Sequence, residues 1–239
     1  MATLLPMIVG LGITAGVMTT AVGFGGGLLL VVCFATVLDP AVALTLTSMA
    51  LLFGNLHRTA LLRRSIATTV LRPYVIGAVP GSVIGALVAV ALPDLAVRLL
   101  IGGGVVLAFV RALGWLRWSP SARALGPAGA GIGLVSATSG GGGLLQGPLF
   151  MASGLTGDSF IATMSFSAVF IHLGRVVGYA HSGLVTTTLI AMSAVLTVAL
   201  VIGNLMGRRL SSAIPAAARS ALELGALTVC AGVALFGMS

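Results

Sequence analysis

The chain is organised around Val22-Gly-Phe-Gly-Gly-Gly-Leu-Leu-Leu30, and a second copy of this stretch reads Ser139-Gly-Gly-Gly-Gly-Leu-Leu-Gln-Gly147. The two copies align at an offset of 116 residues. A glycine inside a helix costs up to about 1 kcal/mol relative to alanine, so a continuous helix is unfavourable through either copy. An internal repeat of half the chain, with a glycine break in each half, is typical of transporters built from repeats.

The composition indicates a membrane protein. Of 239 residues, 58% are hydrophobic and only 7% are charged, whereas a soluble domain has about 25% charged residues. Apolar runs of the roughly 20 residues that cross a bilayer recur throughout the chain. The net charge of +8 comes from arginines, most of them in short loops between these runs. We therefore predict an all-α polytopic membrane protein and no nucleic-acid binding.

We predict two repeats, residues 1–117 and 118–239, within one integral membrane domain. Each repeat consists of a glycine-broken helix hairpin and three transmembrane helices. Residues 4–38 as one helix would be about 50 Å long, which is too long for a single crossing, so a hairpin fits better. The expected segments are the hairpin 4–38 with helices 40–62, 73–92 and 95–115, and the hairpin 125–155 with helices 157–180, 184–206 and 216–238.

The arginines predict the topology. If each hairpin returns to its own side, nine arginines fall on one face, which should be cytoplasmic: Arg63, Arg64, Arg72, Arg111, Arg117, Arg123, Arg208, Arg209 and Arg219. Three full spans per half then make the repeats inverted and place both termini outside. The expected location is the plasma membrane, namely a bacterial cytoplasmic (inner) membrane.

Two copies of Gly-Gly-Gly-Leu-Leu in an all-helical membrane protein, each followed by a helix that bears Thr and Ser, resemble the TauE/SafE sulfite exporter family. This family is also called the 4-toluene sulfonate uptake permease group. The resemblance covers essentially the whole chain and implies a secondary transporter for sulfite, sulfonates or related small sulfur-containing anions. The proline that often follows the motif is present as Pro148, whereas Val32 stands in the first copy. This departure predicts a different shape for the first hairpin.

The glycine breaks are the first candidates for substrate binding. Free N–H groups and a dipole of roughly half a charge make a helix N-terminus an anion site. Short helices starting at Leu28 and Leu144 would direct such ends at the protein centre. The glycines expected to bind substrate are Gly25, Gly26, Gly27, Gly141, Gly142 and Gly143. The alternative is that these glycines only permit close packing.

Hydroxyl and amide side chains could complete the binding shell. The substrate-binding prediction includes Thr47, Ser48, Asn55, Gln146 and Ser165, and further candidates are Thr19, Thr20, Ser136, Thr138, Ser139 and Ser167. Each Ser or Thr could instead be an interhelical hydrogen-bond partner. Gln146 is the stronger candidate, because a buried amide is costly without a partner.

Charged and titratable residues are expected to line the access path. Arg58 and Arg175 match at an offset of 117 residues, and inverted repeats would direct them to opposite faces, with Arg58 in the cytoplasmic vestibule. Alternatively, each guanidinium extends to lipid headgroups. His57 and His172 beside them are candidates for gating, with a structural role as the alternative. Glu223, an acidic residue within a predicted span, is a candidate for proton coupling, or a helix cap.

The sequence thus predicts an exporter of a small anion bound between the two hairpins near the membrane midplane. An intramembrane lipid-modifying enzyme and a non-transporting membrane scaffold are the alternatives. No His, Asp and Glu spacing fits a catalytic set or a metal site, so we expect neither an enzyme nor a cofactor. The expected partners are the anion and the lipid bilayer, and a homodimer is left open.

Overall fold

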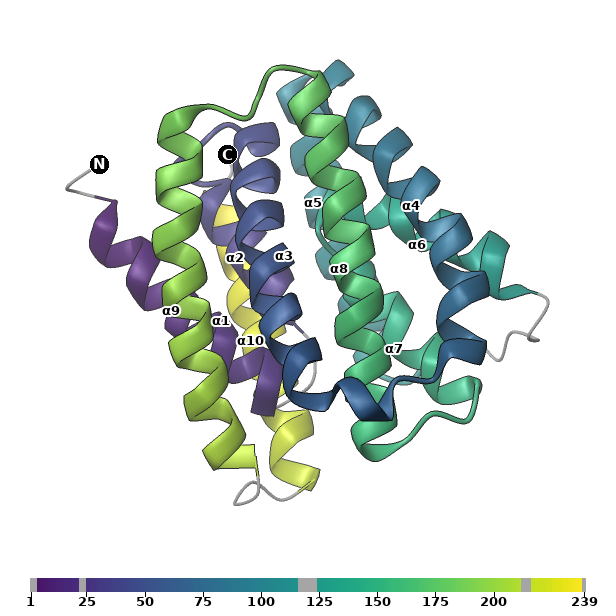
Figure 1. Cartoon of the computed structure of the whole chain (residues 1–239). Helices are drawn as coiled ribbons and strands as arrows, with labels where there is room; N and C mark the ends of the chain where they lie inside the picture. Colours follow the sequence, from purple (N-terminus) through teal and green to yellow (C-terminus); the bar gives the residue numbers. More distant parts are fainter. Residues whose placement is uncertain (1–3, 22–24, 116–123, 212–215, 238–239) are drawn as a thin grey trace.

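The computed structural model describes residues 4–21, 25–115, 124–211 and 216–237, and every regular element in these ranges is a helix (Figure 1). The elements are α1 (Leu5–Ala21), α2 (Gly26–Phe34), α3 (Pro40–Leu62), the 3-10 turn η1 (Arg63–Ser65), α4 (Thr68–Ala91), α5 (Asp94–Ala112), α6 (Leu125–Ser139), α7 (Gly142–Ala152), α8 (Gly157–His181), α9 (Thr187–Ser211) and α10 (Ala216–Gly237).

Long apolar helices form the body of the bundle. Within the described ranges, four segments are long and apolar enough to cross a membrane: Pro40–Ser65, Thr68–Ala91, Gly157–His181 and Thr187–Leu210. The prediction of an all-helical polytopic membrane protein is confirmed at this level, because a span needs about 20 apolar residues and these helices supply them.

Both glycine-rich stretches interrupt a helix. In the first, Gly25 precedes α2 with a φ of 93°, and in the second, Gly140 follows α6 with a φ of 75°. These angles lie in the left-handed region, which glycine adopts without the steric cost of a Cβ atom. In Figure 1 the chain runs down through α1 and back up through α2, so the first broken segment forms a hairpin.

Several helix boundaries differ from the prediction. α2 and α7 begin at Gly26 and Gly142, two residues before the expected Leu28 and Leu144, because glycines of each break form the first turn. α4 begins at Thr68, so Pro73, expected as the first residue of its helix, lies inside it. The hydrogen bond that this proline cannot donate would have gone to the first turn, where carbonyls can still reach water, and the loss is therefore tolerated. α9 extends beyond residue 206 to Ser211, with Arg208 and Arg209 in its last turn, where positive charge complements the helix dipole.

The two halves of the chain pack into each other. α3 and α8 lie side by side in the middle and run in opposite directions (Figure 1). α4 packs against α6, and α1 packs in the same way against α9. Glycines permit the close approach: a Cβ atom at Gly81 would meet the Ala130 carbonyl, and one at Gly203 would meet the Ile13 carbonyl. The glycines of α4 therefore serve close helix packing.

Candidate functional site

A cavity of about 90 Å³ lies where the two glycine breaks meet the central helices. The start of α2 and the start of α7 form one part of its wall, and α3 and α8 form the other. Its described lining consists of Thr19, Gly25, Gly27, Leu28, Leu51, Asn55, Arg58, Ser136, Gly140, Gly141, Gly143, Leu144, Gln146, Met164, Ala168, Ile171 and His172. No Asp, Glu or Cys is among these residues.

Equivalent positions of the two repeats line this cavity together. The pairs at an offset of 116 are Gly25 with Gly141, Gly27 with Gly143, and Leu28 with Leu144, and those at an offset of 117 are Leu51 with Ala168 and Asn55 with His172. Thr19 and Ser136 correspond in space, because each lies against the second glycine of its break. The cavity therefore lies where the halves of the chain face each other.

Both short helices direct their N-terminal ends at the cavity. Among the described residues, the first N–H of α2 bonded to a backbone carbonyl is that of Leu29, which donates to Gly25 at 3.0 Å, and in α7 Leu144 donates to Gly141 at 3.1 Å. The N–H groups before these have no carbonyl partner within their helix. Gly27 and Gly143, in the first turns, line the cavity. Partial positive charge from two helix ends is thus concentrated on this space.

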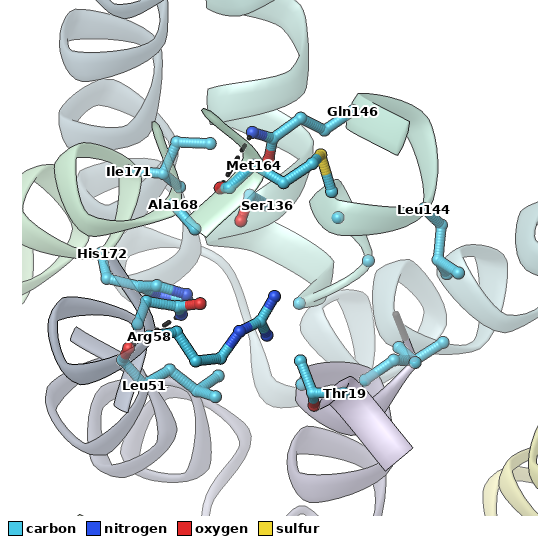
Figure 2. A pocket seen from close by; sticks show the side chains of 17 residues that line it. Thr19, Leu51, Arg58, Ser136, Leu144, Gln146, Met164, Ala168, Ile171 and His172 are labelled. Carbon is cyan, nitrogen blue, oxygen red and sulfur yellow. Dashed lines mark hydrogen bonds between the residues drawn. The ribbon is translucent and has the colours of Figure 1, made fainter. Parts of the chain in front are cut away.

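Arg58 is the one cationic side chain in the described lining. It is only 7% exposed, and Figure 2 shows its guanidinium reaching from α3 into the space bounded by Thr19, Ser136 and Gln146. No described residue accepts a hydrogen bond from it, and no described carboxylate pairs with it. The cavity therefore combines one full positive charge with two helix N-termini.

The polar groups around Arg58 differ in what they can offer a ligand. The Gln146 amide is held by α8, since its Nε2 donates to the Ser167 hydroxyl and, at 3.5 Å, to the Met164 carbonyl. The Thr19 hydroxyl already donates to the Ala15 carbonyl at 2.6 Å. The Ser136 hydroxyl has no hydrogen-bond partner among the described residues. Of these groups, Ser136 is the one with a free donor.

His172 lies beside Arg58 in Figure 2, and its buried Nδ1 has no partner among the described residues. Its repeat equivalent is Asn55, whose Nδ2 donates to the Leu51 carbonyl at 2.8 Å. Within the ranges described, no group of three His, Cys, Asp or Glu side chains gathers that could hold a metal ion. One full positive charge and two helix N-termini in the same cavity favour binding of a small anion.

The structure brings together about half of the predicted substrate-binding residues. Gly25, Gly27, Asn55, Gly141, Gly143 and Gln146 line the cavity. Gly26 and Gly142 do not, because each is packed against the other arm of its own hairpin, where a Cβ atom would meet Thr19 and Ser136 respectively. The side chains of three others, Thr47, Ser48 and Ser165, are buried. Their hydroxyls donate hydrogen bonds to carbonyls one turn earlier in the same helix.

The residues predicted to line the access path do not lie together in the structure. Arg58 and His172 line the cavity, whereas Arg175 lies outside it, only 1% exposed, with its Nη2 donating to the Leu44 carbonyl at 3.3 Å. His57 is half-buried, and its Nδ1 lacks a partner among the described residues. Glu223 lies in α10, and its side chain is outside the described residues.

Apolar wall residues were not predicted from the sequence. Leu51, Ala168, Ile171, Met164, Leu28 and Leu144 enclose the cavity, and as single apolar residues in apolar helices they carry no signal of their own. The offset of 117 residues that relates Arg58 to Arg175 could have found the pair Leu51 and Ala168, one turn beyond the pair Asn55 and His172.

A second hollow of about 410 Å³ lies between α5 and α10. Its described lining is apolar apart from Arg98, which already donates to the Ala35 carbonyl at 2.8 Å. Leu95, Leu99 and Val106 on its rim are exposed, as expected for a surface that faces lipid. The smaller central cavity is therefore the better candidate for a polar ligand.

Comparison with known proteins identifies the family of the chain. No curated protein and no solved structure matches the chain. The family model described as sulfite exporter TauE/SafE matches residues 8–236, a range that includes both glycine breaks, the central helices and all residues of the cavity lining. An all-helical bundle with two broken helices around a cationic cavity is consistent with an anion transporter of this kind. The chain belongs to the TauE/SafE sulfite exporter family.

Proposed function

We propose that this chain is a secondary transporter that exports a small sulfur-containing anion, such as sulfite or a small sulfonate, through the central cavity. The observation that carries the proposal is Arg58, a buried guanidinium directed into the cavity with no partner among the described residues. A buried charge costs several kcal/mol unless it is paired. A bound anion supplies the missing partner.

The helix ends around Arg58 support binding that can be reversed. The N-termini of α2 and α7 contribute only partial charges, so a bound anion meets one full positive charge and a set of hydrogen-bond donors. A transporter needs such a balance, because a site with several full charges would hold its substrate too tightly to release it. The free hydroxyl of Ser136 and the first-turn N–H groups supply donors that need no proton transfer.

The size of the cavity favours a compact substrate. Its volume of about 90 Å³ is that of a small cavity, since roughly 10–15 Å³ of such space holds one water molecule. An oxyanion with four or five non-hydrogen atoms fits such a space. Leu51, Ile171 and Met164 would exclude larger organic groups in the described conformation.

The helix packing supports a pair of inverted repeats, residues 1–117 and 118–239. α1 packs on α9 as α6 packs on α4, and α3 lies antiparallel to its equivalent α8. Repeats of this kind let one half move against the other around a fixed site, which exposes the site to each side in turn. Substrate binding on the central axis follows from that arrangement.

The positions of the arginines support the proposed orientation. α3, which is followed by Arg63 and Arg64, and α9, which has Arg208 and Arg209 in its last turn, both end at the lower side of Figure 1. This end is cytoplasmic by the positive-inside rule. The termini are then outside, in a bacterial inner membrane. A negative interior favours exit of an anion by about 2.3 kcal/mol per charge at 100 mV, so export requires no coupling ion, and proton coupling through Glu223 stays a prediction.

The experiment that tests the function is sulfite flux from proteoliposomes at low substrate concentration. Arg58→Gln should lower the initial rate at least about 30-fold, which corresponds to about 2 kcal/mol for the loss of one member of a buried charge pair. Arg64→Gln is the matched control, because Arg64 is an exposed arginine of the same segment, just beyond α3. Wild-type protein without sulfite flux, or parental flux in Arg58→Gln, would contradict the proposal.

A further inference from the structure

The two repeat-related arginines occupy different surroundings. Arg58 on α3 points into the cavity, and its guanidinium has no hydrogen-bond partner among the described residues. Arg175 on α8 is sealed between helices, where Nη2 donates to the Leu44 carbonyl of α3 at 3.3 Å. Its buried Nε has no partner among the described residues. A fully buried arginine held by one long hydrogen bond to a carbonyl and by the neighbouring Tyr179 side chain is costly, and buried charges at membrane depth are functional candidates.

The carbonyl that holds Arg175 has an equivalent on the other helix. Leu44 lies 14 residues before Arg58 in α3, and Ile161 lies 14 residues before Arg175 in α8. Each carbonyl also accepts a hydroxyl from the next turn, Ser48 in the case of Leu44 and Ser165 in the case of Ile161. Among the described residues, an arginine donates to the first carbonyl and none donates to the second.

We infer that Arg175 is a second anion-binding arginine and that the two arginines exchange roles during transport. In the described state Arg58 faces the cavity and Arg175 is held by the Leu44 carbonyl. In the opposite state Arg175 faces the cavity and Arg58 is held by the Ile161 carbonyl. This inference rests on the proposed transport function and adds a second binding residue to it.

The symmetry of the lining supports the exchange. Six pairs of equivalent positions, with threonine or serine, glycine, leucine and polar residues among them, already meet around the cavity. Arg58 lines it without its equivalent Arg175, as Gln146, Met164 and Ile171 do without Leu30, Thr47 and Gly54. The bond that one arginine loses on entering the cavity is replaced by the bond that the other forms on leaving it. The two states therefore have similar free energies, as a transporter that cycles between them requires.

Equilibrium binding of sulfite to purified protein tests the exchange. If either arginine can serve, Arg58→Gln and Arg175→Gln should each keep measurable binding, weakened no more than about tenfold, although the flux of each falls further because a complete transport cycle passes through both states. The double variant should bind at least tenfold more weakly than either. If Arg58→Gln alone binds no better than the double variant, Arg175 does not bind the anion and the inference is wrong. If the wild type binds no sulfite, the proposed function itself fails.

A second measurement does not depend on the folding of variants. Wild-type protein is treated with phenylglyoxal, which modifies accessible guanidinium groups, and the adducts are mapped by mass spectrometry. Exchange predicts adducts on both Arg58 and Arg175, although Arg175 is sealed in the described state. If Arg58 is modified to completion while Arg175 never reacts, Arg175 has only a structural role and the inference is overturned.

Discussion

At the residue scale, two neighbouring glycines of α7 have opposite surroundings. A Cβ atom at Gly142 would meet the Ser136 side chain in the other arm of the hairpin, whereas one at Gly143 would have nothing within 4 Å. Gly143 lines the cavity and Gly142 does not. The first glycine is therefore needed for packing, and the second leaves the N-terminal end of the helix open to a ligand.

Alanine at these two positions should separate folding from binding. Gly143→Ala should keep the melting temperature of the purified protein but weaken sulfite binding about 5- to 30-fold, because the methyl group covers helix N–H donors worth about 1–2 kcal/mol. Gly142→Ala should lower the melting temperature, since the hairpin must open to admit the Cβ atom. Thermal unfolding and calorimetric binding in one detergent measure both. Parental affinity in Gly143→Ala would remove the α7 N-terminus from the site.

At the element scale, α4 and α6 are joined through small residues. Cβ atoms at Gly77 and Gly81 of α4 would meet carbonyls of α6, and one at Gly129 of α6 would meet the Tyr74 carbonyl of α4. In a membrane the apolar surface has no water to escape, so helices associate through such close packing. This contact ties the second hairpin to the first half of the chain.

The α4–α6 contact should be sensitive to a single methyl group. Gly129→Ala should destabilise the protein by about 1–3 kcal/mol through overpacking, which corresponds to a fall of about 2–12 °C in melting temperature. Gly131→Ala on the same helix is the control, because a Cβ atom there meets nothing within 4 Å, and alanine is the better helix former. Equal melting temperatures for the two variants would show that the α4–α6 contact does not limit stability.

At the scale of the whole molecule, the long helix α4 runs from one membrane face of the bundle to the other. Thr68 and Asp94 lie at opposite ends of the segment formed by α4 and the turn after it, and both are exposed. The proposed orientation assigns the Thr68 end, which follows Arg63 and Arg64, to the cytoplasm. The same assignment makes Asp94 and the end of α8 external.

Cysteine labelling of intact cells should report this orientation. In a background with Cys33 and Cys230 replaced, a membrane-impermeant maleimide should label Asp94→Cys and Ser182→Cys but not Thr68→Cys. Permeabilised cells supply the control, because all three positions should then react. Labelling of Thr68→Cys from outside would reverse the orientation, and labelling of all three in intact cells would contradict the topology.

Local sequence was sufficient to predict the class of this protein. The length of the apolar runs indicates helices that cross a membrane, because the thickness of the bilayer sets the number of apolar residues that a spanning helix needs. The glycines of each repeat predict a broken helix, because they lower helix propensity at one point. These two properties depend on neighbouring residues alone. They located the hairpins, the central helices and the glycines that line the cavity.

The roles of individual polar residues were decided by tertiary contacts. Thr47, Ser48 and Ser165 look like ligands in the sequence, yet in the folded chain their hydroxyls donate to carbonyls of their own helices. The sequence pairs His172 with its neighbour Arg175, whereas the structure places it in the cavity beside Arg58. Which face of a helix meets the cavity depends on how the two halves pack.

The sequence by itself determined an all-helical membrane protein with a repeated glycine break, and with it the TauE/SafE family. Only the tertiary structure decided that Arg58 faces the cavity and that Arg175 is held by the Leu44 carbonyl. The two arginines occupy equivalent positions in the repeat, so local sequence gives no reason to distinguish them. The difference arises because the two halves pack differently around the two side chains, and such packing is a property of the folded molecule.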